Sequence, residues 1–310
     1  MKNYILISLI ISFNMYAQNK EPMKNILSKY SFENKIVKVK DLEISYIKEG
    51  DGEKTLLFVH GLSSNLEAWS KNIKQLKKTY TCVAIDLPGF GKSTIKDVKS
   101  TPTFFAEVIM DLIIKLNLKN ITLIGHSMGG QASAKFAIKY PNKIQKLILI
   151  APAGLEEFTD KEAGFMKMVF TPEIVQNTSD AQIERNYELN FYKSPQEIKT
   201  MVEDRKKIKN ASNFKEHCQA IAQSVYGMLD EPIIEDLKLI NTPTLLVFGE
   251  NDALIPNKIF HPTLKLEDVI KVATTSIKNL KLETISESGH FVQFEKSQEV
   301  NRCIKSFVKN

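Results

Sequence analysis

Strand-like and helix-like patterns of apolar residues alternate along most of this chain. Continuous apolar runs, typical of strands covered on both faces, occur at residues 55–59, 81–85, 121–124, 144–150 and 244–248. Segments with a helical pattern lie between them, at residues 66–76, 104–116 and 131–140. Residues 280–285 predict a last strand, and residues 293–308 predict a closing helix. Repeated alternation of this kind predicts a mostly parallel sheet flanked by helices.

Two segments depart from this alternation. Residues 35–40 and 42–47 alternate apolar and polar side chains, which predicts an antiparallel pair at one edge of the sheet. After the turn Ala151-Pro-Ala-Gly154 the chain is polar and helical as far as about residue 236, without a strand-like run. We therefore expect a core of residues 18–153 and 237–310, with residues 154–236 forming a helical cap over the carboxyl edge of the sheet.

The first seventeen residues have the pattern of a signal peptide. Lys2 precedes an apolar run over residues 4–13, and small and polar residues then lead to Ala17. Met15 is bulky for a position three residues before the predicted cleavage. The run is shorter than the roughly 20 residues that span a bilayer. We expect residues 1–17 to be removed and the protein to be periplasmic or secreted, without a stable membrane span; an uncleaved N-terminus would instead leave it associated with the membrane.

Composition narrows the class of protein. The 310 residues are 43% hydrophobic and 25% charged, as in ordinary globular proteins. The net charge of +6 comes from scattered lysines, so no nucleic-acid partner is expected. Cys82, Cys218 and Cys303 are too few and too far apart to predict a disulfide framework, and the histidines lack the spacing of metal ligands. We expect neither a metal nor a cofactor.

A candidate nucleophile lies in the sequence Gly125-His-Ser127-Met-Gly129, which fits the pattern G-x-S-x-G. It directly follows a predicted buried strand and directly precedes a predicted helix. A serine on such a sharp turn stands clear of the sheet, and the flanking glycines let strand and helix approach closely. The sequence therefore predicts that Ser127 is a nucleophile.

A serine hydroxyl needs a general base, and that base needs an acid to orient it. His290 follows the last predicted strand, so its loop reaches the same edge of the sheet as Ser127. His126 should point to the other side of the turn. Asp252 follows the preceding strand and is the expected acid; Glu250 is the nearest alternative, and spacing alone leaves it open. The order serine, acid, histidine is that of α/β-hydrolases.

The tetrahedral intermediate of such a reaction needs hydrogen-bond donors for its oxyanion. We expect two backbone N–H groups to supply them. One belongs to Met128, the residue after the nucleophile, and the other to Leu62, after the strand that ends at Val59. His60 is expected to have a structural role.

Five motifs in the expected order, between about residues 40 and 308, resemble the α/β-hydrolase superfamily. They are His60-Gly61, Asp86-Leu-Pro-Gly-Phe-Gly91, Gly125-His-Ser-Met-Gly-Gly130, Asp252 with Pro256, and Gly289-His290. The resemblance implies the α/β-hydrolase fold with a helical cap insertion. Ser127-Met-Gly-Gly-Gln131 and Ala151-Pro-Ala-Gly-Leu155 are similar to monoacylglycerol-lipase-like esterases, and a serine at position 127 disfavours the dehalogenases and epoxide hydrolases. Residues 257–276 form a longer stretch than the usual pattern.

The predicted function is hydrolysis of a carboxylic ester through an acyl-enzyme. Aromatic and methionine side chains of the cap either line an apolar acyl pocket or form the cap's own core; the candidate substrate-binding residues are Phe165, Met168, Phe191 and Tyr192. A small-molecule ester with an apolar acyl chain is the expected substrate. The same triad also serves thioester, amide and carbon–carbon hydrolysis, and the fold also serves receptors without catalysis. The complete triad favours an enzyme.

Overall fold

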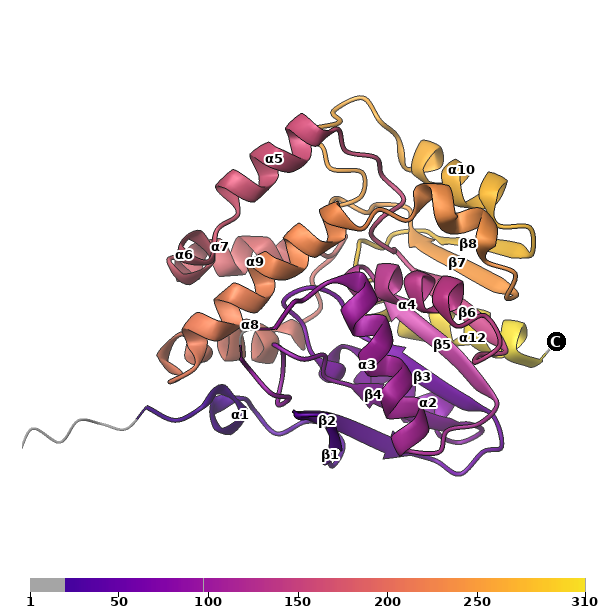
Figure 1. The fold of residues 1–310 in the computed structure, drawn as a ribbon, viewed down its shortest axis with the longest axis horizontal. Coiled ribbons are helices and arrows are strands. Elements are labelled where there is room, and N and C mark those ends of the chain that lie inside the picture. The colour runs from indigo at the N-terminus through magenta and orange to yellow at the C-terminus, as the bar shows by residue number, and fades with distance from the viewer. Residues whose placement is uncertain (1–19, 97, 310) are drawn as a thin grey trace, which may run out of the picture.

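The computed structural model describes residues 20–96 and 98–309, so the predicted signal peptide lies outside it and stays a prediction. Eight strands form one sheet in the order β1-β2-β4-β3-β5-β6-β7-β8 (Figure 1). Their bounds are β1 Lys35–Val39, β2 Leu42–Glu49, β3 Thr55–Val59, β4 Thr81–Ile85, β5 Ile121–His126, β6 Lys146–Ile150, β7 Thr244–Gly249 and β8 Leu280–Ile285. These strands correspond closely to those that the apolar runs predict.

The sheet is parallel from β4 to β8 and antiparallel at its other edge. β1 pairs with β2, and β2 pairs with β4, in antiparallel register. β3, β5, β6, β7 and β8 join through parallel pairs. The predicted edge pair and the mostly parallel sheet are therefore confirmed.

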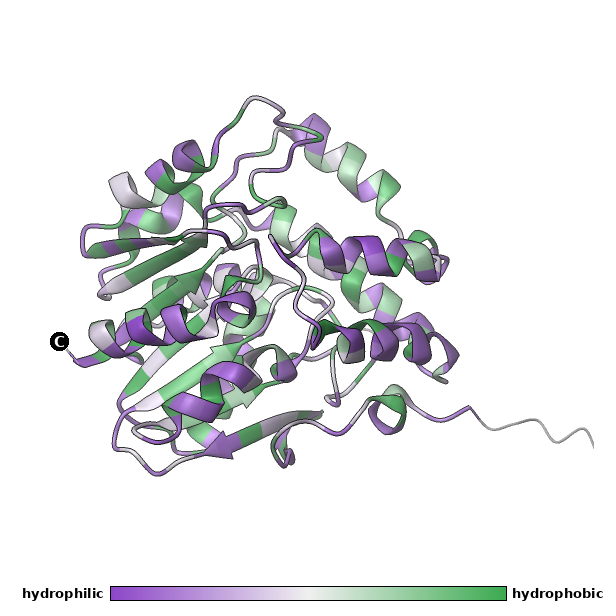
Figure 2. Cartoon of the chain, turned by 180° about the vertical axis from the view of Figure 1, so that it is seen from behind, coloured by the Kyte–Doolittle hydropathy of each residue, from purple (hydrophilic) through white to green (hydrophobic). Residues whose placement is uncertain are grey.

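Two hydrophobic cores fill the two faces of the sheet, because successive side chains of a strand point to opposite faces. In β3, Leu57 belongs to the core under α3, α4 and α10, whereas Phe58 belongs to the core under α2, α11 and α12. Figure 2 shows hydrophobic strands inside and hydrophilic stripes on the outer helices. The core helices are α2 Ser70–Leu76, α3 Pro102–Lys115, α4 Met128–Lys139, α10 Leu266–Ser276, α11 Val292–Glu295 and α12 Ser297–Lys309, with 3₁₀ turns η1 Leu66–Trp69 and η3 Ile234–Leu239.

Between β6 and β7 the chain forms only helices in the described structure. Before η3, they are α5 Asp160–Val169, α6 Pro172–Gln176, α7 Asp180–Glu188, α8 Ile198–Lys207, the 3₁₀ turn η2 Ile208–Asn210 and α9 Phe214–Asp230. Figure 1 shows them gathered on one side of the sheet. α9 is the longest of them and packs against α3 and α4, so it joins this helical segment, which we call the cap, to the core.

The structure differs from the predicted elements at several ends. α4 begins at Met128, three residues before the predicted start, because its two glycines take helical conformation in the tightly packed first turn. The predicted closing helix is two helices, since Lys296 leaves the helical region at φ −115°, ψ 46°. The long stretch after Asn257 contains a loop followed by α10.

The pattern of apolar residues predicts no element in residues 20–34. The structure forms α1 Met23–Ile26 there, with Met23 buried in the larger core. Its backbone N–H donates to Asn213 Oδ1 at 2.9 Å, and Ser28 Oγ donates to Asp204 Oδ1 at 2.7 Å. The segment thus lies against the cap. No helix among the described residues combines the length and the apolar character that crossing a bilayer needs.

Candidate active site

Ser127 occupies a strained turn between β5 and α4. Its φ of 53° and ψ of −120° are unusual for a residue with a side chain, and such a conformation costs about 1–3 kcal/mol. Backbone hydrogen bonds hold it there: its N–H donates to Ile150 O at 3.0 Å, and its carbonyl accepts from Gln131 and Ala153 at 3.0 and 3.1 Å. Ser127 is half-buried, whereas the residues on either side of it are fully buried. The turn therefore presents the serine to solvent.

The glycines around Ser127 permit a very close approach of backbone segments. A β-carbon on Gly125 would lie 2.3 Å from the carbonyl oxygen of Gly129, and one on Gly129 would lie 2.4 Å from that of His60. Any side chain at either position would force β5, α4 and the loop after β3 apart. The glycines of the G-x-S-x-G pattern are therefore needed for close packing of strand and helix, as the sequence suggested.

His290 and Asp252 form a buried pair at the ends of β8 and β7. His290 Nδ1 lies 2.8 Å from Asp252 Oδ2, and the two side chains are only 4% and 0% exposed. The other carboxylate oxygen, Oδ1, accepts the backbone N–H groups of Leu254 at 2.8 Å and Ile255 at 3.0 Å. With Nδ1–H donating to the carboxylate, Nε2 is left to accept a proton.

Glu250, the alternative acid, takes no part in this pair. It is exposed, and its Oε1 accepts a hydrogen bond from Thr284 Oγ1 at 3.1 Å. Geometry thus brings Asp252, and not Glu250, to the imidazole.

His126 contacts His290, which sequence reasoning missed because it placed the His126 side chain on the other side of the turn. Its Nε2 lies 3.0 Å from His290 O, and the centroids of the two rings are 4.8 Å apart. It also packs edge-on against Phe291, at 4.7 Å between centroids. Burial, and next the neighbouring His290, holds the pKa of His126 well below its ordinary value. A neutral His126 donates from Nε2 to the loop that carries His290.

His126, which directly precedes Ser127, contacts His290. The side chains of Ser127 and His290 are not joined by any of the hydrogen bonds between described residues. Serine–histidine hydrogen bonds are often loose without substrate and tighten in the reacting complex. Gly61, in the loop after β3, also lies close to Ser127, because a β-carbon at Gly61 would be 3.1 Å from Ser127 Cβ. The loop after β3, the turn at Ser127 and the His290 loop therefore converge at one point.

The two backbone N–H groups expected to bind an oxyanion belong to residues beside Ser127. Met128 is the first residue of α4, where helix N–H groups have no intrahelical partner, and Leu62 belongs to the loop beside Ser127. Neither N–H donates a hydrogen bond in the part of the chain that the structure describes. Both are thus available to a ligand atom near Ser127.

His60 holds the loop that carries Leu62. Its Nδ1 lies 2.7 Å from Gly61 O, and its Nε2 accepts the backbone N–H of Leu87 at 3.0 Å. Complete burial lowers the pKa of His60 to about 4, so the ring is neutral and bridges two segments. The expected structural role is confirmed.

Asp86, part of the motif Asp86-Leu-Pro-Gly-Phe-Gly91, also holds loops near the site in place. The carboxylate is fully buried and accepts from Leu66 N at 2.8 Å, Tyr30 Oη at 2.8 Å and Lys92 N at 2.9 Å. Burial raises the pKa of Asp86 to about 6, against the opposing effect of these hydrogen bonds. It ties the N-terminal segment to the loop that begins at His60.

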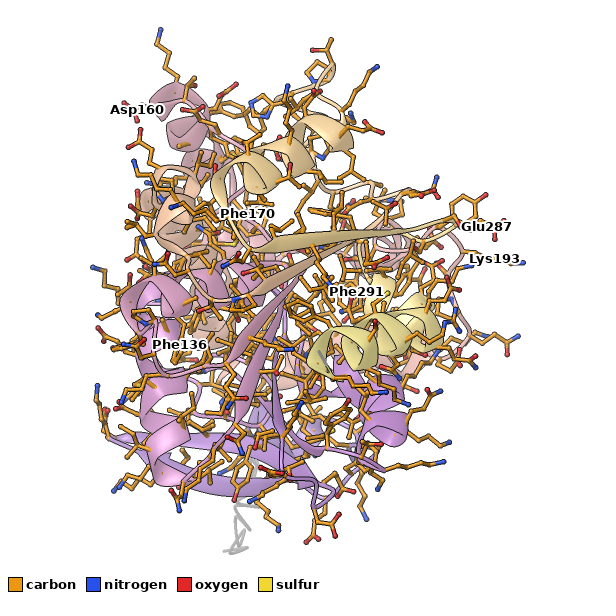
Figure 3. The ribbon with its side chains drawn as sticks, turned by 90° about the vertical axis from the view of Figure 1, so that its right-hand side faces the viewer. Phe136, Asp160, Phe170, Lys193, Glu287 and Phe291 are labelled. Carbon is orange, nitrogen blue, oxygen red and sulfur yellow. The ribbon has the colours of Figure 1, made fainter. Side chains whose placement is uncertain are left out.

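A cavity of about 370 Å³ adjoins the candidate site. It reaches Leu62 on the core side and Phe291, the residue after His290. Its apolar lining from the cap is Phe170, Ile174, Val175, Ile183 and Ile221. Phe170 and Phe291 are labelled in Figure 3, on the cap and near the ends of the strands. The cap therefore covers the carboxyl ends of the strands and leaves an apolar space there.

The four predicted substrate-binding residues are not among the residues that line this cavity, and their role stays a prediction. Phe165 and Met168 are 50% and 67% exposed on α5, and Tyr192 is 54% exposed. Phe191 is buried, but it packs against Phe291 and Phe294 at 5.6 and 6.4 Å between centroids. The cap segment is polar and its helices are short, so the sequence does not show which face of each cap helix points inward.

A cluster of ionisable residues joins the start of the cap to the loop after Asp252. Glu156 accepts the backbone N–H of Asn257 at 2.9 and 3.0 Å and lies 2.5 Å from His261 Nδ1. Glu162 lies 3.4 Å from His261 Nε2. We call Glu156, Glu162, Asn257 and His261 the cap clasp. No group of three or more His, Cys, Asp or Glu side chains in the described part of the chain is arranged to hold a metal ion.

Comparisons with known proteins agree with this architecture. A family model described as alpha/beta hydrolase fold matches residues 54–297. Similar proteins include the dihydrolipoyllysine-residue acetyltransferase component of the acetoin cleaving system of Cupriavidus necator, 24% identical over 272 residues and covering 87% of this chain and 67% of that protein. The 2-hydroxy-6-oxononadienedioate/2-hydroxy-6-oxononatrienedioate hydrolase 1 of Pseudomonas putida is 24% identical over 277 residues, covering 86% of this chain and 92% of that protein.

Solved structures show the same fold. An esterase from Exiguobacterium antarcticum aligns with a TM-score of 0.75 at 22% identity, covering 90% of this chain and 100% of that one. The chain belongs to the α/β-hydrolase family of enzymes. The fold predicted from the sequence and the resemblance to this superfamily are confirmed.

Proposed function

We propose that this protein is a serine hydrolase that cleaves carboxylic esters through an acyl-enzyme. Ser127 is the nucleophile, His290 the general base, and Asp252 the acid that orients the base. The observation that carries the proposal is the buried pair of His290 Nδ1 and Asp252 Oδ2, 2.8 Å apart, beside a strained serine turn.

The reaction follows from this geometry. Ser127 Oγ attacks the ester carbonyl and gives its proton to His290 Nε2, while Asp252 stabilises the imidazolium through Nδ1–H. The carbonyl oxygen becomes an oxyanion that accepts hydrogen bonds from two backbone N–H groups, those of Leu62 and Met128. Collapse of the intermediate breaks the ester C–O bond, and the alcohol leaves with the proton from His290.

Hydrolysis of the acyl-enzyme repeats these steps with water. His290 takes a proton from the attacking water, and the second oxyanion collapses to release the carboxylic acid and restore the Ser127 hydroxyl. The apolar cap residues of the 370 Å³ cavity support an apolar acyl chain as the group held beside the site.

The test is hydrolysis of p-nitrophenyl esters across a series of acyl lengths. Ser127→Ala should lower kcat by several orders of magnitude without unfolding the protein, and the best acyl length should report the size of the cavity. A folded wild type that hydrolyses no ester, or a Ser127→Ala variant as active as the wild type, would overturn the proposal.

Carbon–carbon hydrolysis is the second candidate, because the Pseudomonas putida relative is named as a hydrolase of 2-hydroxy-6-oxononadienedioate. The same serine, histidine and acid would serve it. Assaying a vinylogous 1,5-diketone acid beside the ester series separates the two: the ester proposal predicts much the larger kcat/KM for an ester.

A further inference from the structure

Arg205 of α8 lies where two cavities meet beneath the cap. One is the 370 Å³ cavity that reaches Leu62 and Phe291, and the other, of about 770 Å³, lies between α8 and the N-terminal segment. The residues common to both linings are Ser63, Ser64, Tyr187 and Arg205. A group bound at Arg205 would therefore lie in a space that reaches Leu62, in the loop beside Ser127, and Phe291, the residue after His290.

The Arg205 guanidinium has no counter-ion among the described residues. It takes part in no ion pair and no hydrogen bond there, and its Nη1 is buried without a partner. The adjacent carboxylate, Asp204, is occupied by Ser28, whose N–H and Oγ both donate to it. The guanidinium carbon instead lies 5.5 Å from the centroid of the Phe214 ring.

Tyr187 and His217, the two titratable rings beside Arg205, are neutral. Burial raises the pKa of Tyr187 to about 12, so its phenol stays protonated and can donate a hydrogen bond. Burial, and next the charge of Arg205, lowers the pKa of His217 to about 3, so that ring carries no charge at neutral pH. A cation withdrawn from water without an ionised partner is costly, and proteins usually supply a partner. Here the described chain supplies none.

We propose that Arg205 and Tyr187 form a receptor for a carboxylate at the far end of the substrate's acyl chain. This rests on the proposed function and narrows it to half-esters of dicarboxylic acids. A guanidinium offers a planar pair of N–H donors that matches a carboxylate, and Tyr187 adds a neutral donor. One cation balances one carboxylate charge, whereas it would leave a phosphate dianion undercompensated.

The larger cavity supports an anionic substrate independently. Its lining contains five cationic side chains, of Lys29, Lys71, Lys74, Lys77 and Arg205, against three carboxylates, of Glu67, Glu197 and Asp204. Lys71 pairs with Glu197 at 3.0 Å, and Lys77 pairs with Glu49, which lies outside the lining, at 2.5 Å. Lys29 and Lys74 form no ion pair within the described residues. An excess of positive charge around a concave surface raises the local concentration of an anion.

Two substrates of equal acyl length test the proposal. p-Nitrophenyl hydrogen adipate ends in a carboxylate, and p-nitrophenyl hexanoate ends in a methyl group. We expect the wild type to prefer the adipate half-ester by at least about tenfold in kcat/KM. Arg205→Met should reduce that preference about 10- to 100-fold, mainly through KM, and Arg205→Lys should reduce it less.

A matched control comes from the same helix. Lys207 is exposed two residues further along α8, so Lys207→Met should leave the preference unchanged. Tyr187→Phe should lower the preference about five- to tenfold, because it removes one hydrogen bond to a charged group. An Arg205→Met variant that loses activity equally on both esters would assign the residue a structural role and overturn the receptor.

The outcomes separate this inference from the proposed function. If neither ester is hydrolysed, the proposed function fails; if both are hydrolysed without preference for the carboxylate, the receptor alone fails. Should the Arg205 variants not fold, inhibition of wild-type hexanoate hydrolysis is measured with adipate and with adipamide. Adipate should compete at least tenfold better, and equal inhibition by the two would overturn the receptor.

Discussion

His126 Nε2 lies 3.0 Å from the backbone carbonyl oxygen of His290, so the residue before the proposed nucleophile holds the residue proposed as the base. This contact joins the end of β5 to the loop after β8, which are 164 residues apart in the chain. Because the ring is buried and neutral, it acts through a hydrogen bond and through packing. His126 is therefore a positioning residue in this account.

His126→Phe keeps a ring against Phe291 and removes the donor to His290. Loss of one such hydrogen bond, about 1 kcal/mol, predicts a fall in kcat of roughly five- to tenfold. A structural defect alone would leave the shape of the pH–rate profile unchanged, whereas displacement of His290 should shift its acidic limb. If the variant has the kcat and the pH–rate profile of the wild type, His126 does not position His290.

Asp252→Asn should lower kcat by about 10⁴-fold, because an amide favours the wrong tautomer of His290. The fold should survive, since an asparagine oxygen can still accept from Leu254 and Ile255. Glu250→Gln is the matched control, and near-normal kcat is expected because Glu250 is exposed and bonds to Thr284. Steady-state kinetics on one p-nitrophenyl ester measures both, and a larger loss in Glu250→Gln would reverse the assignment.

Much of this site could be predicted from the sequence because its chemistry is tied to strand ends. Ser127, Asp252 and His290 each follow a strand of the parallel part of the sheet, and parallel strands bring their carboxyl ends to one edge. The spacing alone did not decide which carboxylate pairs with His290, since Glu250 and Asp252 are two positions apart in one turn. Only the structure shows which of them turns inward.

The cap could not be predicted in the same detail. α5 has no buried residue, so apolar side chains such as Phe165 and Met168 do not reveal an inner face. The unpaired guanidinium of Arg205 lies in a basic run that has the appearance of a solvated helix face. The burial of Arg205 Nη1 depends on the tertiary packing around α8, which no local pattern contains.

His217 should make the fold less stable in acid. Its pKa is lowered to about 3 by burial, against an ordinary value near 6.5, so below pH 6.5 the unfolded chain takes up a proton that the folded chain does not. The stability from this residue is complete above pH 6.5 and is lost as pH falls, by up to about 1.4 kcal/mol per pH unit.

His217→Asn tests this dependence while keeping an N–H near Gly89 O, which His217 Nδ1 contacts at 2.8 Å. Urea unfolding at pH 7, 6 and 5 should show a shallower fall in the free energy of unfolding for the variant than for the wild type. Parallel slopes in the two proteins would mean that His217 is protonated in the folded state.

The cap clasp should stabilise the junction between the cap and the loop after Asp252. Glu156→Ala removes the acceptor for Asn257 N–H and the partner of His261, and we expect a loss of about 1–3 kcal/mol in the free energy of unfolding. Glu157→Ala, at an exposed neighbour, should cost less than about 0.5 kcal/mol. Thermal unfolding of both variants measures this, and equal midpoints would show that the clasp adds nothing.

The nucleophilic role of Ser127 is tested most directly by reaction with a fluorophosphonate, followed by intact-mass and peptide mass spectrometry. We expect one adduct per chain on the peptide that contains Ser127, and none in a folded Ser127→Ala variant. A folded wild type that forms no adduct, or a variant that is labelled as fast as the wild type, would contradict it.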